Sequence, residues 1–71
     1  MKIPEGVSRS QLIAAIDEWI VGNHAERNRM IMKRRLVDGI RLEPLAEEFE
    51  LSYRQIRYIV QRSEVIIFSH I

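Results

Sequence analysis

The side chains best suited to chemistry are grouped in one short stretch, SYRQIRYIVQ, between Ser52 and Gln61. Arginine and glutamine can pair with guanine and adenine edges, and tyrosine and serine hydroxyls can bond to phosphate oxygens. Four of these side chains follow the i, i+3, i+4, i+7 spacing of one helix face: Arg54, Arg57, Tyr58 and Gln61. No acidic residue occurs from residue 53 to 63. The pattern predicts a positive helix face that can read bases or hold phosphates, and the alternative is an ordinary solvated face.

Enzymatic chemistry has much weaker support. His24 and His70 are isolated at opposite ends of the chain, without metal-ligand spacing around either. Adjacent Glu47 and Glu48 point in different helical directions, and no glycine-rich phosphate loop is present. We therefore expect no catalytic residue, no cofactor and no metal ion.

Two short helices would position the basic face. Ser52 and Gln55 have the spacing of a capping box, which predicts a helix over 53–68 with an inner stripe that includes Ile56, Ile59 and Val60. Before it, the stripe of Leu45, Ala46 and Phe49 predicts a helix over 43–50, with Pro44 in its first turn. Ala46 is small enough for a close crossing. A helix-turn-helix is the expected arrangement, with 53–68 as the recognition helix.

The run from Glu26 to Phe68 resembles region 4 of bacterial sigma-70-type factors and, more loosely, LuxR-type DNA-binding domains. In that family a helix rich in arginine and aliphatic residues precedes a DG(I/L) turn, as in RNRMIMKRRLVDGI. The next helix has the form x-x-E-x-(I/L)-A-E-x-x-x-(L/V)-S, matched by LEPLAEEFELS. The recognition helix, x-R-Q-(I/V)-x-x-(I/V), is matched by YRQIRYI. The resemblance implies binding to double-stranded DNA and a partnership with RNA polymerase.

Two positions depart from the family pattern. Glu50 occupies the turn position usually held by glycine, so the turn must form without glycine's freedom. Leu42 stands where Thr, Ser or Asp normally caps the first helix of the motif. The chain also lacks the sigma region that grips the other promoter element, so a complete sigma factor is not expected.

Two further helices are predicted upstream. Residues 1–7 are expected to form an N-terminal arm, followed by a helix over 8–21 that starts at a Ser8–Gln11 capping box and stops at Gly22. Asn23 and Glu26 suggest a third cap, at the start of a central helix over 23–38. The expected fold is all-α: one small four-helix domain over 1–71 with a C-terminal helix-turn-helix.

The charges are segregated along the chain although the net charge is only +1. Five basic residues lie between Arg27 and Arg35, and three lie between Arg54 and Arg62, with no acid in either run. The first run is expected to meet backbone phosphates where exposed, and Arg35 is the favoured candidate because it is on the least apolar side of its helix. The acids gather on the 43–50 helix, which could face a protein.

The C-terminal segment, SEVIIFSHI, holds an apolar cluster that we expect to be too large for the chain's own core: Ile66, Ile67, Phe68 and Ile71. Two interpretations account for it. The segment folds back onto the N-terminal helix around Trp19, or it pairs with that helix across a two-fold axis in a homodimer. The dimer is slightly favoured because regulators of this kind often bind two half-sites.

These patterns favour a sequence-specific DNA-binding protein, a small transcriptional regulator. Its predicted DNA-binding residues are Ser52, Tyr53, Arg54, Gln55, Arg57, Tyr58, Gln61 and Arg35. The competing interpretation is a protein-interaction module that docks on the transcription machinery without reading DNA. The absence of cysteine, signal peptide and membrane-length apolar run in this sequence predicts a cytoplasmic location.

Overall fold

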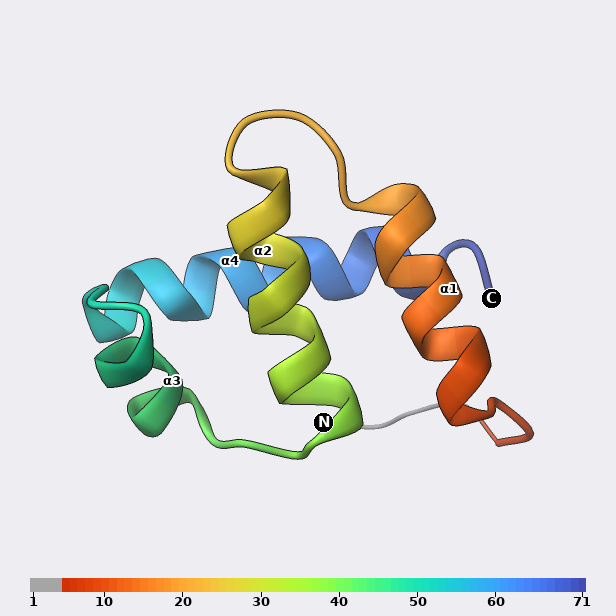
Figure 1. The fold of residues 1–71 in the computed structure, drawn as a ribbon, viewed down its shortest axis with the longest axis horizontal. Helices are drawn as coiled ribbons and strands as arrows, with labels where there is room; N and C mark the ends of the chain where they lie inside the picture. Colours follow the sequence, from red (N-terminus) through yellow and green to blue (C-terminus); the bar gives the residue numbers. More distant parts are fainter. Residues whose placement is uncertain (1–4) are drawn as a thin grey trace.

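The computed structural model describes residues 5–71, and Figure 1 shows that these form a small helical assembly. Its elements are α1 (Arg9–Trp19), α2 (Ala25–Met32), the π-helical turn η1 (Lys33–Val37), α3 (Leu42–Glu48) and α4 (Tyr53–Phe68). No strand occurs within the described residues. The all-α, four-helix prediction is therefore confirmed. Residues 1–4 of the expected N-terminal arm lie outside the described residues.

Helix α1 begins where its capping box predicts. The Ser8 amide donates to Gln11 Oε1 at 2.7 Å, and the Gln11 amide donates to Ser8 Oγ at 3.1 Å. The helix ends at Trp19, two residues before the predicted limit, and the chain then turns through Gly22 at φ +93°. Glycine is suited to this turn because it adopts positive φ without a steric penalty.

The predicted cap of α2 at Asn23 is wrong. The residue directly before the helix is His24, in the left-handed conformation at φ +58°, and it makes no side-chain capping bond. Asn23 is thus one position too early for its side chain to serve as the cap residue. Helix α2 begins at Ala25, two residues later than predicted.

The helix does not stop at the end of α2 but continues as η1. The Asp38 amide donates to the Lys33 carbonyl at 3.2 Å, which is the i→i−5 bond of a π-helical turn. Nothing in the sequence pattern predicted this widening. The combined helix covers residues 25–37, close to the predicted 23–38.

The connection between α3 and α4 is a tight turn with a complete set of capping bonds. Glu50 adopts φ +54°, and the Leu51 amide donates to the Ala46 carbonyl at 2.9 Å while the Glu50 amide donates to the Glu47 carbonyl at 3.2 Å. This pair of bonds is a Schellman motif, which normally uses glycine at the position of Glu50. The expectation that Glu50 must supply the turn conformation is confirmed.

A second capping box starts α4 immediately after that turn. The Gln55 amide donates to Ser52 Oγ at 3.1 Å, and the Ser52 amide donates to Gln55 Oε1 at 2.9 Å. Helix α4 covers the predicted residues 53–68. At the start of α3 the residue before the helix is Arg41, so Leu42 is the first helical residue and not the cap.

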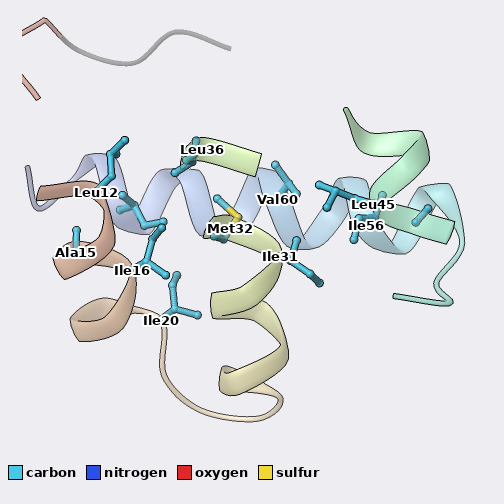
Figure 2. Packing of buried hydrophobic residues seen from close by; sticks show 12 residues of the cluster. Leu12, Ala15, Ile16, Ile20, Ile31, Met32, Leu36, Leu45, Ile56 and Val60 are labelled. Carbon is cyan, nitrogen blue, oxygen red and sulfur yellow. The ribbon is translucent and has the colours of Figure 1, made fainter. Parts of the chain in front are cut away.

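Helix α4 is the common support of the fold. In Figure 1, α1 and α2 cross it side by side, and α3 lies at its N-terminal end. Figure 2 shows the apolar side chains that fill the space between these elements. The fully or nearly fully buried large side chains come from all four α-helices: Ile16, Ile31, Met32, Leu45, Ile56, Val60 and Ile67. This core fixes α4 with one side inward along its whole length.

The C-terminal segment packs within its own chain. Ile67 is fully buried, Ile66 and Phe68 are partly buried against the core, and the Trp19 and His70 rings stack with centroids 3.6 Å apart and planes 6° from parallel. Ile71, by contrast, is 41% exposed, so three of the four apolar residues pack at least in part within the chain and one stays largely at the surface. The segment thus folds back onto α1 at the Trp19–His70 stack, and the homodimer stays a prediction.

Candidate nucleic-acid interface

Helix α4 has two sharply different sides. Its buried side repeats every three to four residues, with Ile56, Val60, Ser63 and Ile67 facing the core. The opposite side is exposed and carries the predicted outer stripe: Arg54, Arg57, Tyr58 and Gln61. Tyr58 is 60% exposed, so even the aromatic member of the stripe stands free of the core. The structure thus brings these four residues together on one accessible face of a single helix.

The three remaining candidates on this segment lie at the helix start. Ser52, Tyr53 and Gln55 are all exposed, but the Ser52 hydroxyl and the Gln55 side-chain oxygen already bond within the capping box. Their first duty is therefore to hold the first turn of α4. The same bonds order the first helical turn, which carries Arg54.

The two leading arginines of α4 form no ion pair with the part of the chain that the structure describes. Within residues 5–71, neither Arg54 nor Arg57 forms an ion pair or a side-chain hydrogen bond. Further along, Arg62 Nη1 donates to the Tyr58 hydroxyl at 3.1 Å. Arg54 and Arg57 consequently place positive charge without an ion-pair partner on the outer side of α4, and such charge is the electrostatic requirement for binding a polyanion.

The basic run between Arg27 and Arg35 is used differently. Lys33 Nζ lies 2.7 Å from Asp17 Oδ1, and Arg34 Nη2 lies 2.9 Å from Glu48 Oε1. Arg34 also reaches Asp38 at 3.3 Å, and its hydrogen bond to Glu48 raises the pKa of the guanidinium. These pairs join α1 to η1 and η1 to α3. Two of the five positive charges in this run, those of Lys33 and Arg34, are therefore compensated within the chain.

Arg35 lies apart from the outer face of α4. It is in η1, half-buried, and its Nη1 donates to the Ile40 carbonyl at 2.9 Å, while its Nε is buried without a partner among the described residues. Arg29 has a similar duty, since its Nε donates to the Ile20 carbonyl at 2.8 Å. These bonds give both arginines a structural role in holding loops. Arg35 is therefore poorly suited to the phosphate contact predicted for it.

Sequence reasoning missed a groove beside the outer face of α4. The groove has a volume of about 520 Å³ and lies between the α1–α2 connection, the first turn of α2 and one flank of α4. Its polar lining includes His24, Arg27, Asn28, Gln55, Tyr58 and Arg62. We call it the α2–α4 groove. In the sequence, only the i, i+4 spacing of Tyr58 and Arg62 could have indicated this groove. Its other wall depends on how α2 crosses α4.

No family model, curated protein or solved structure matches this chain. Among residues 5–71, no helix has the length and apolar character needed to cross a membrane.

Proposed function

We propose that the protein binds double-stranded DNA in a sequence-specific manner, with α4 as the helix that enters the major groove. A major groove about 12 Å wide admits one α-helix, and arginine, glutamine and tyrosine are side chains that reach base edges or phosphates there. Helix α3 and the Schellman turn then form the first half of a helix-turn-helix that holds α4 at the surface. The class of protein is a small transcriptional regulator, similar to sigma-70 region 4, acting in the cytoplasm.

One observation carries this proposal. The basic residues of α2 and η1 are largely paired or bonded within the chain, whereas Arg54 and Arg57 on α4 are exposed and have no such partner among residues 5–71. Two arginines that lack partners, near a helix start already held by a capping box, have little structural purpose. Their chemistry is that of a contact to an external anion.

The proposal is tested with single substitutions on the outer face of α4. Arg54→Ala and Arg57→Ala should each weaken binding to a sequence selected from random DNA by about 1–3 kcal/mol, because a good arginine–guanine pair has that value. Binding is measured by fluorescence anisotropy of a labelled duplex. Arg9→Ala removes an exposed arginine from the distant start of α1 and serves as the matched control. Unchanged affinity in both α4 variants, with folds intact by circular dichroism, contradicts the proposal.

A second candidate function has one observation in its favour. Glu43, Glu47 and Glu50 are exposed around α3 and form no ion pair with residues 5–71. Such an acidic surface suits a basic protein partner, for example a subunit of RNA polymerase. A protein that captures such a partner through α3 but fails to select any DNA sequence would favour this function over DNA reading.

A further inference from the structure

We propose that the α2–α4 groove binds a small amphipathic anion, meaning a molecule with one carboxylate, phosphate or sulfonate group on an apolar body. The groove volume of about 520 Å³ falls within the range of about 300–1,000 Å³ that is typical of small-molecule sites. Binding at this place requires no assumption about DNA.

The floor of the groove is apolar. Ile20, Ile59 and Ile66 line it, together with Leu51. Ile59, Ile66 and Leu51 are only partly covered by the rest of the chain. The stretch of α4 that borders the groove, from Gln55 to Ile66, is roughly 16 Å long at the rise of an α-helix. An apolar body of a few rings or a short chain would cover this floor and remove it from water.

The rim of the groove is basic. Arg27 stands on the α2 side and Arg62 on the α4 side, and no acidic residue is among those that line the groove. Each arginine is held by a neutral neighbour: Arg27 Nε donates to Asn28 Oδ1 at 3.2 Å, and Arg62 Nη1 donates to the Tyr58 hydroxyl at 3.1 Å. Neither guanidinium group forms an ion pair within residues 5–71, and both have further donors for a bound anion.

The combination of an apolar floor and a basic rim distinguishes this groove from a simple contact to the DNA backbone. A phosphate diester needs positive charge and donors, but it gains nothing from a floor of isoleucine and leucine side chains. Equally, an apolar ligand gains nothing from two arginines. Only a ligand with both characters uses the whole surface of the groove.

The position of the groove gives the ligand a regulatory consequence that rests on the proposed function. Gln55 and Tyr58 belong both to the groove lining and to the exposed surface of α4. A ligand held there would restrict Tyr58 and place negative charge at Arg62, on the same helix as Arg54 and Arg57. Since DNA is itself anionic, we expect occupancy of the groove to weaken DNA binding.

The binding test uses 8-anilinonaphthalene-1-sulfonate as the probe and no DNA. Titration into ¹⁵N-labelled protein should shift the backbone amides around Arg27, Tyr58 and Ile66 in two-dimensional NMR spectra, and should leave those of α3 unchanged. Arg62→Gln and Arg27→Gln should each weaken the probe about threefold to tenfold, which is the effect of one solvated charge-assisted contact. Arg41→Gln, an exposed arginine before α3, is the matched control and should bind the probe as the unmodified protein does.

Two further probes separate the alternatives. N-phenyl-1-naphthylamine has the same rings without the sulfonate and should bind several-fold more weakly, and inorganic phosphate alone should bind more weakly still. Equal affinity for the neutral probe would overturn anion recognition, and equal affinity for phosphate would make the groove a plain phosphate contact. Probe shifts outside the groove would also overturn the proposal. None of these outcomes depends on whether α4 reads DNA.

Discussion

Glu50 shows how a single residue can depart from the usual turn chemistry while the turn keeps its form. A non-glycine residue in the left-handed region costs about 1–2 kcal/mol, yet both Schellman bonds, donated by the Glu50 and Leu51 amides, are formed. The sequence predicted this position because the family pattern places a glycine there. The predicted cap at Asn23 was wrong. Side-chain types do not reveal that His24 adopts the left-handed conformation, and this conformation makes a cap at Asn23 impossible.

Replacing Glu50 with glycine should stabilise the protein by up to about 1 kcal/mol, since the relief of left-handed strain exceeds the entropy that glycine adds to the unfolded chain. Urea unfolding followed by circular dichroism measures the change. The opposite substitution is available at Gly39, which has φ +72° and no atom within 4 Å of an added Cβ. Gly39→Ala should destabilise by about 1 kcal/mol through the backbone alone. A loss of stability in Glu50→Gly would show that the glutamate makes a favourable interaction in solution.

At the scale of elements, the two capping boxes made α1 and α4 predictable, and α4 has the predicted limits. The start of α2 and the π-turn η1 were not predictable in the same way, because neither has a local side-chain signature. The pairing of the basic run was also missed. Lys33 meets Asp17 and Arg34 meets Glu48 across separate helices, and such contacts depend on the crossing geometry rather than on the spacing along one helix.

The start of α4 gives a prediction at this scale. Ser52→Ala should lower the free energy of unfolding by about 1 kcal/mol, because the Gln55 amide would lose its acceptor. It should also weaken DNA binding, since fraying of the first turn releases Arg54 from its fixed direction. Ser8→Ala removes the equivalent cap from α1 and should lower stability to a similar extent with DNA binding retained. Equal effects of the two variants on DNA affinity would mean that α4 needs no defined N-terminus to bind.

For the whole molecule, the main change from the sequence interpretation concerns the apolar C-terminal segment. The segment has one fully buried member, Ile67, and a ring stack between Trp19 and His70 that closes the chain on itself. Hydrophobic periodicity places residues on faces of a helix but does not state which helix covers them. The packing of this segment against α1 could therefore be seen only in the tertiary arrangement of α1 and α4.

We expect the protein to sediment as a monomer of 8.4 kDa at high micromolar concentration. Ile67→Ala should lower the free energy of unfolding by about 2–5 kcal/mol, as for other buried large-to-small substitutions. In a dimer held by this segment, the same substitution would instead yield a stable folded monomer. Val65→Ala, at a position that is 69% exposed, is the control and should have little effect.

The central claim is that α4 reads DNA, and selection of bound sequences from random duplex DNA at two salt concentrations tests it most directly. The account predicts that one short sequence is enriched. It also predicts that affinity for that sequence falls with salt as phosphate contacts release counterions, and that the Arg54→Ala, Arg57→Ala double variant loses the enrichment. Absence of any enriched sequence, or an enrichment that the double variant retains, would contradict the assignment of α4 as the DNA-reading helix.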